Sequence, residues 1–135
     1  MTEGERGSAL LEVILLGLVL IVPLVWLLGV LAQVHIAALA TDAAAREIGW
    51  ELTRGGDPMT GVERATISAF ADHGLDPGVA DVAWRGQVER GAKVRVTASY
   101  PVALASFPVL GNLSQPVFWV RATHDAHVAE YRSSG

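Results

Sequence analysis

A long uncharged segment near the N-terminus limits the folds that are open to this chain. Residues 13–41 include no Asp, Glu, Lys or Arg, and residues 13–32 are apolar throughout. The hydrocarbon core of a bilayer is about 30 Å thick, which a helix of roughly 20 apolar residues can cross. The sequence therefore predicts one membrane-spanning helix, with the span at about residues 9–33.

A short polar leader precedes this segment, and a single carboxylate stands at the boundary between them. The leader comprises residues 1–7 and ends at Gly7, and Ser8 follows it. Glu12 is the fifth residue after Gly7 and the last charged residue before the apolar run. An ionisable side chain costs up to about 2.5–3.5 kcal/mol at the centre of a membrane helix and less near an end. Glu12 is therefore either a headgroup-level residue without a role of its own or a functional group.

A glycine, four residues, a glutamate and then a long apolar helix resemble the processing site of type IV prepilins and their pseudopilin relatives. The resemblance implies that a membrane-embedded aspartic prepilin peptidase cuts after Gly7. Ser8 would then be the new N-terminus, and Glu12 would be the fifth mature residue. The family usually has an aromatic residue after the glutamate, and this chain has Val13 at that position.

Two other interpretations of the N-terminus stay open. In the first, the chain is an unprocessed bitopic membrane protein whose outer domain binds an envelope partner. In the second, a signal peptidase releases a small secreted domain after Ala40, since Ala38-Leu39-Ala40 has the small-x-small pattern. Against the second, the apolar segment is far longer than the roughly 7–15 residues of a signal-peptide core.

The charges that flank the span predict its orientation. Arg6 lies before the span, and the first Lys or Arg after it is Arg46. Cationic residues close to the ends of a span favour the cytoplasmic side. We therefore expect a single-pass protein of the cytoplasmic membrane, with the short N-terminus inside and the larger C-terminal part outside.

Composition and motif content argue against most other classes of function. The formal net charge is −4, whereas a nucleic-acid-binding protein would show a basic patch. The chain has no cysteine, so it has no disulfide framework and no thiolate site. It also lacks an HExxH motif, a P-loop and a dinucleotide fingerprint. His124 and His127 are three residues apart, which places them on opposite faces of a strand. We therefore expect no catalytic residue, metal, cofactor or small-molecule substrate.

The helix is predicted to continue beyond the membrane to Arg54, which gives one helix over residues 8–54. Pro23 lies inside its apolar half and is expected to kink or loosen it. The second half is rich in alanine, and Gly55-Gly56 supplies a stop. A face of helical period is predicted at Ala37, Thr41, Ala44, Ile48 and Leu52.

Four small residues spaced four apart form a second pattern in the same half. We call them the small-residue ladder: Ala37, Thr41, Ala45 and Gly49. Small side chains let another backbone approach closely, as helices do in membranes and filaments. The ladder could therefore pack against a neighbouring subunit or against the domain of its own chain, and the sequence favours neither.

Residues 55–135 are predicted to form a small extracytoplasmic α+β domain. Thr60 and Glu63 have the spacing of a capping box that opens a short helix, and Gly74 stands where that helix would end. Alternating residues from about 79 to 100 predict a hairpin that turns near Arg90-Gly91, and Pro101 is expected to close its second strand. A third strand follows Pro116. The long first helix would cover the apolar face of this antiparallel sheet, as a sheet of this size requires.

Periodicity also predicts which side chains of this domain are covered. The apolar stripe of the short helix is Val62, Ala65, Ala69 and Phe70. The apolar side of the second strand is Val94, Val96, Ala98 and Tyr100, and that of the third begins with Phe118, Val120 and Ala122. The solvated face of the sheet is expected to carry Arg85, Lys93, Arg95 and Arg121. Core or domain-interface positions are expected for Trp50, Trp84 and Trp119.

The short single-helix chain and its hairpin resemble the TadE-like minor pseudopilins of the tight-adherence (Flp) pilus system. This resemblance implies a pilin-like α+β fold and a structural role in a pilus or a related secretion machine. The partners would be the membrane, the prepilin peptidase, other pilin or pseudopilin subunits and the pilus assembly platform. In a core of packed apolar helices, the Glu12 carboxylate would pair with the Ser8 amine of a neighbour and select one axial register.

Overall fold

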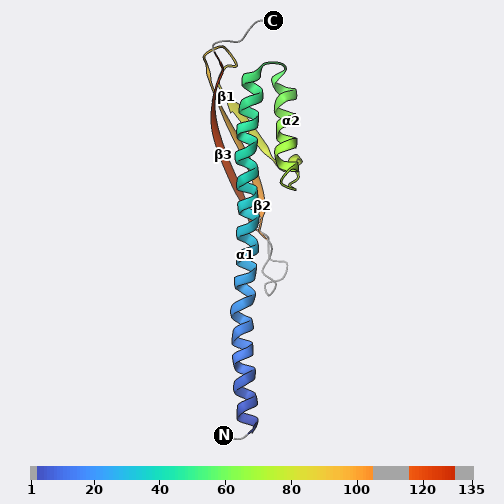
Figure 1. The fold of residues 1–135 in the computed structure, drawn as a ribbon, viewed down its shortest axis with the longest axis vertical. Coiled ribbons are helices and arrows are strands. Elements are labelled where there is room, and N and C mark those ends of the chain that lie inside the picture. The colour runs from blue at the N-terminus through green and yellow to red at the C-terminus, as the bar shows by residue number, and fades with distance from the viewer. Residues whose placement is uncertain (1–2, 105–115, 130–135) are drawn as a thin grey trace.

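The computed structural model describes residues 3–104 and 116–129, and these form one long helix with a small domain on its far half (Figure 1). The elements are α1 (Glu3–Arg54), α2 (Pro58–Ala71), a 3-10 turn (Pro77–Val79), β1 (Asp81–Arg85), β2 (Lys93–Ala103) and β3 (Val117–His127). The expected α+β fold, with a three-stranded antiparallel sheet, is confirmed. The predicted connection through residues 107–112 and the C-terminal tail lie outside the described residues.

Helix α1 is 52 residues long and is therefore about 78 Å from end to end. It begins at Glu3, five residues earlier than the predicted start at Ser8, so residues 3–7 of the leader are part of the helix. Glu3 and Glu5 lie in its first turn, where carboxylates favour the positive end of the helix dipole. Its end at Arg54 is confirmed, and Gly55 follows with φ of 86°.

The start of α2 corrects a sequence prediction. The N-cap is Asp57, not Thr60, and Pro58 occupies the first turn, where the missing N–H has no partner to lose. The Asp57 carboxylate accepts hydrogen bonds from the backbone N–H of Thr60 (3.2 Å) and from the Thr60 hydroxyl. These bonds hold the pKa of Asp57 below its usual range, with the Thr60 hydroxyl as the largest cause.

The end of α2 agrees with the prediction at Gly74. This residue has φ of 71°, a value that glycine adopts without strain. The N–H of Leu75 donates to the carbonyl of Phe70 (2.9 Å), and the N–H of Gly74 donates to that of Ala71 (2.9 Å). This pair of bonds is a Schellman arrangement, which satisfies the last carbonyls of the helix.

The sheet has the order β1-β2-β3, and both pairings are antiparallel. Strand β2 continues through Pro101 to Ala103, so the prediction that Pro101 closes it is wrong. The pairing of β1 begins at Asp81 opposite Ser99, which leaves one edge of β2 unpaired beside Pro101. A proline there costs no hydrogen bond of the ladder between β1 and β2.

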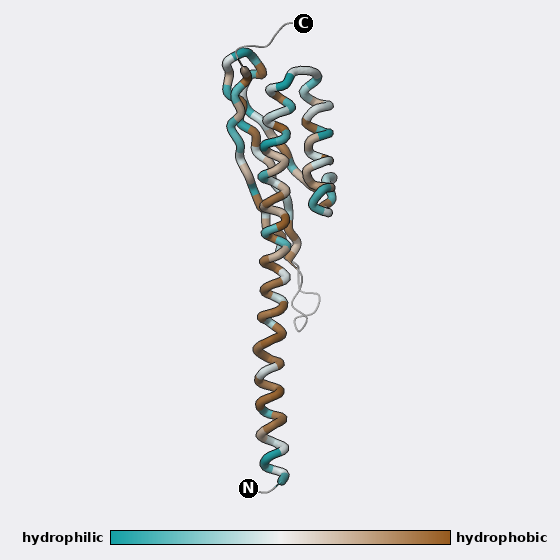
Figure 2. The backbone as a smooth tube through the Cα atoms, viewed as in Figure 1, coloured by the Kyte–Doolittle hydropathy of each residue, from teal (hydrophilic) through white to brown (hydrophobic). Residues whose placement is uncertain are grey.

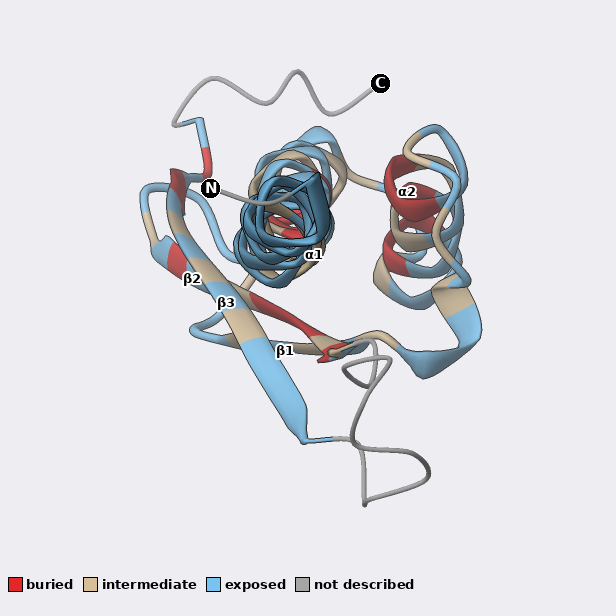
Figure 3. Cartoon of the chain, turned by 90° about the horizontal axis from the view of Figure 1, so that it is seen from below, coloured by how far each residue is buried: buried red, intermediate tan, exposed pale blue. Residues whose placement is uncertain are grey.

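The core lies between the far half of α1, helix α2 and one face of the sheet (Figure 3). The predicted stripe of α2 is buried at Val62, Ala65, Ala69 and Phe70, and the rings of Phe70 and Tyr100 stack with centroids 5.0 Å apart. The predicted face of α1 is buried as well. Its fully or almost fully covered residues are Ala37, Ala40, Thr41, Ala44, Ala45, Ile48, Gly49 and Leu52.

Candidate functional site

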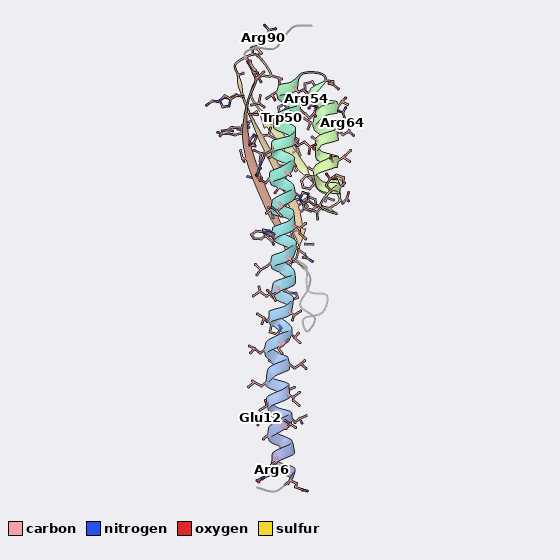
Figure 4. All side chains as sticks on the ribbon, in the orientation of Figure 1. Arg6, Glu12, Trp50, Arg54, Arg64 and Arg90 are labelled. Atoms are coloured by element: carbon pink, nitrogen blue, oxygen red, sulfur yellow. The ribbon has the colours of Figure 1, made fainter. Side chains whose placement is uncertain are left out.

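The candidate processing site lies on the first turns of α1, far from the domain. Figure 4 shows Arg6 and Glu12 near the N-terminal end of the helix. Gly7, Ser8 and Glu12 are all exposed. Apart from the neighbouring backbone of the helix itself, nothing lies within 4 Å of a Cβ built on Gly7, so the fold itself does not require a glycine at this position. The peptide bond after Gly7 and the Glu12 carboxylate are thus open to a partner.

The apolar half of α1 follows this site, and most of its side chains are exposed. It is the one helix among the described residues that is long and apolar enough to cross a membrane, with a mean hydropathy of 3.0 over its best window and none of that window buried. Figure 2 shows the continuous hydrophobic stretch below the domain. The chain is therefore compatible with a single-pass membrane protein.

Pro23 lies within this half and does not end the helix. The backbone is α-helical on both sides of it, from Glu3 to Arg54. The cost of an interior proline is the hydrogen bond that its missing N–H cannot make and the clash with the preceding turn. The kink or loosening expected at Pro23 stays a prediction.

The small-residue ladder faces the domain of its own chain. Ala37, Thr41 and Ala45 have no exposed surface. The Thr41 hydroxyl donates to the carbonyl of Ala37 (2.9 Å) within the helix, which satisfies a polar group in the core. Of the two roles that the sequence left open, these burials favour packing on the domain of the same chain, because the covered side chains are not available to another helix.

Gly49 packs closely against β3. A Cβ added there would lie 3.0 Å from Cδ2 of His124 and 3.2 Å from the Cβ of Ala126, both on β3. His124 is half-buried on the inner face of the strand, and His127 is exposed on the outer face, so the predicted separation of the two is confirmed. Gly49 thus lets α1 approach the sheet closely.

The outer face of the sheet is open to solvent at Arg85, Lys93, Arg95 and Arg121, as predicted. Arg95 donates two hydrogen bonds to the carboxylate of Asp125, from Nε to Oδ1 (2.7 Å) and from Nη2 to Oδ2 (2.9 Å). The guanidinium of Arg95 holds the pKa of Asp125 below its usual range, chiefly through this hydrogen bonding. Such an exposed pair fixes the strand register more than it stabilises the fold.

Two tryptophans that were predicted to be core or interface residues are exposed. Trp50 retains 66 % of its surface, and the guanidinium of Arg54 lies 5.4 Å from the centre of its ring, within the range of a cation–π contact. Trp119 retains 55 % on the outer face of β3. Trp84 is half-buried against the core, as predicted.

Sequence reasoning missed a cluster at the start of β3, which we call the sheet tip. It consists of Val117, Phe118 and Trp119, which are 55, 58 and 55 % exposed. The alternating pattern suggested that Phe118 would be covered. A different signal in the sequence could have indicated this cluster: residues 100–120 contain no charged residue and no histidine.

The described part of the chain was compared with the ligand sets that metal ions require. Residues 3–104 and 116–129 hold no group of three or more His, Cys, Asp or Glu that could bind a metal ion. Comparison with protein-family models, with curated proteins and with solved structures finds no match to this chain. Its function must therefore be argued from its own residues.

Proposed function

We propose that this chain is a pseudopilin-like structural subunit of a Tad/Flp-type pilus or a related secretion machine, cleaved after Gly7 by a prepilin peptidase. One observation carries the proposal. The Gly7 to Glu12 junction opens an uninterrupted helix whose first half is bare and apolar and whose second half is covered by a small sheet. The subunit would be held in the cytoplasmic membrane, with its domain outside, until it is assembled.

The exposure of the first half of α1 supports this role. Most apolar side chains along it keep roughly half or more of their surface, such as Leu16 at 70 % and Leu20 at 71 %. Surface of this kind needs lipid or other apolar helices around it. A filament core of packed helices and a bilayer both supply that environment, so one helix can serve in the membrane and in an assembly.

Glu12 is the group that would distinguish one arrangement of such helices from another. A charge without a partner inside an apolar core is strongly unfavourable, because breaking a buried pair costs about 3–5 kcal/mol. The free amine of Ser8 in a processed neighbour would be its counter-charge. Pairing across subunits would then favour a single axial offset between helices.

The interpretation as a secreted domain fits the geometry less well. Ala38, Leu39 and Ala40 lie in the middle of α1, and Ala40 is fully buried in the core. A cut after Ala40 would remove Ala37 and Ala40 from the domain that is to be released. The unprocessed bitopic protein remains the second candidate, because its domain would keep the whole core.

The substitution Glu12→Gln tests the assembly role, because it keeps the size of the side chain and removes its charge. Cleavage after Gly7 should persist, whereas co-purification with other pilus subunits should fall. The matched control is Glu47→Gln, which removes a carboxylate from an exposed position of the same helix beside the domain. Wild-type assembly of Glu12→Gln with normal cleavage would contradict the register role and favour the bitopic protein.

A further inference from the structure

Along the axis of α1, the sheet tip is level with the C-terminal end of the apolar segment of the helix. We call this position along the axis its height. Val117 pairs with Ala103 at the end of β2. Ala103 and the neighbouring Pro101 line the same hollow as Gln33 and Ile36 of α1. Figure 1 shows these ends of β2 and β3 as the part of the sheet nearest to the bare half of the helix.

Chain geometry gives the same height independently. Gly49 and His124 are level, because they almost touch. From His124 back to Val117, β3 runs towards the N-terminal end of α1 over about 23 Å, at about 3.3 Å per residue. Along α1, which rises about 1.5 Å per residue, the same distance corresponds to about 15 residues. Val117 is therefore level with a point about 15 residues before Gly49, close to Val34.

This height corresponds to the interfacial layer of a bilayer. Residues 13–32 of α1 are about 30 Å long, which equals the hydrocarbon thickness. The headgroup regions bring the total to about 40–45 Å, so each adds roughly 5–8 Å, or about the next three to five residues of the helix. Gln33 and Ile36 fall within that layer, and so does the sheet tip.

The chemistry of the tip suits this layer. No residue in the described segments 100–104 and 116–120 is charged, and the first charge along β3 is Arg121. On α1 the first charge beyond the span is Asp42. Tryptophan and other amphipathic aromatic side chains favour the membrane–water interface. Figure 3, from below, shows the exposed end of β3 extending past α1, where the helix does not cover it.

We propose that the sheet tip binds the lipid surface itself, with Phe118 and Trp119 placed in the interfacial layer on opposite faces of the strand. The domain would then be attached to the membrane at two points, the span of α1 and the tip of the sheet. This second contact fixes how the domain is turned about the helix axis. The inference rests on the membrane-spanning part of the proposed function, and it is independent of cleavage and of assembly.

The absence of cysteine makes a direct test possible on the full chain in phosphatidylcholine nanodiscs. A nitroxide label is attached to one introduced cysteine, in the variants Val117→Cys, Thr123→Cys or Leu24→Cys. Thr123 is an exposed residue farther along β3, and Leu24 lies in the apolar half of α1. The measurement is the accessibility of each label to apolar oxygen and to a water-soluble nickel chelate.

The oxygen-to-nickel accessibility ratio at Val117 should exceed that at Thr123 several-fold and approach that at Leu24. Adding Phe118→Ser and Trp119→Ser to the Val117→Cys variant should lower its ratio towards the Thr123 value. Adding Trp50→Ser, which removes an exposed tryptophan at the far end of the domain, should not.

Two results would overturn the proposal. A nickel-accessible label at Val117, equal to that at Thr123, would place the tip in water. A label reached by neither reagent would mean that protein covers the tip, such as a second copy of the chain. A low ratio at Leu24 is a different failure, because it would show that α1 does not lie in lipid and would remove the basis of the proposed function as well.

Discussion

The far half of α1 is predicted to be indispensable to the domain, and removing it is the perturbation that tests the fold most directly. A fragment of residues 55–135 keeps α2 and the sheet and loses every core residue of α1. A fragment of residues 33–135 keeps them all. The longer fragment contains buried side chains that the shorter one lacks. These are the four fully buried alanines (Ala37, Ala40, Ala44 and Ala45) and the buried Ile48 and Leu52.

The size of the loss follows from the buried groups. A buried methyl group contributes about 0.8 kcal/mol, and a buried Ile or Leu side chain contributes about 1.5–3 kcal/mol. Together these six side chains contribute on the order of 6–9 kcal/mol. The net stability of a domain is only about 5–15 kcal/mol, so the shorter fragment should lack a stable fold.

Urea unfolding of the two fragments, followed by near-UV circular dichroism, measures this. The fragment of residues 33–135 should show one cooperative transition, and that of residues 55–135 should show none. Within the longer fragment, Ile48→Ala should lower the free energy of unfolding by about 2–5 kcal/mol. Arg46→Ala, at an exposed site on the same helix, should change it by about 0.5 kcal/mol or less. Cooperative unfolding of the shorter fragment with an unchanged midpoint would refute the packing described above.

Two further predictions concern the close contact of α1 with β3 and the cap of α2. In the full chain in detergent, Gly49→Leu should lower the free energy of unfolding by about 1–3 kcal/mol through overpacking, less a helix-propensity gain of up to about 1 kcal/mol. Gly29→Leu, at a position with open space around it, should not lower it, and equal effects of the two would contradict the packing. Because the pKa of Asp57 is lowered in the folded state, its stabilising contribution is complete above its unfolded value of about 3.9 and is lost as the pH falls through the folded value. The melting temperature should therefore fall more below pH 4 in the wild type than in Asp57→Asn, and parallel pH profiles would argue against this role of Asp57.

Periodicity was sufficient for the elements and for most of the core. The helical spacing of residues 37–52 predicted the buried face of α1, and the alternation in β2 predicted its buried residues. Both patterns are local, because each is set by one element that turns one face to the core. For the same reason the polar outer face of the sheet could be predicted from Arg85, Lys93, Arg95 and Arg121.

The errors occurred where a local motif competed with a neighbour. Thr60 and Glu63 have capping-box spacing, but Asp57 followed by Pro58 starts the helix one turn earlier, because proline fits the first turn of a helix. A proline such as Pro101 is typical of a strand end. Here β1 is too short to pair with this part of β2, so the proline is tolerated inside the strand. The length of a partner strand is not visible in the sequence of the strand that it pairs with.

The candidate site was predicted from the sequence alone, and its residues are accessible in the structure at Gly7, Ser8 and Glu12. What the sequence could not decide was the role of the small-residue ladder, because a stripe of small residues fits a neighbouring helix and the chain's own sheet equally well. The sheet tip was overlooked because alternation describes which face a side chain is on, and not whether another element covers that face.

Intact-mass analysis of the protein extracted from native membranes tests the central claim most directly. The account predicts a mature chain that begins at Ser8. Gly7→Leu should block the cut without destabilising the helix, because no atom lies near that position, whereas Gly4→Leu in the same leader should leave the cut unchanged. A mature chain that begins at Met1, Thr2 or Thr41 would contradict the account.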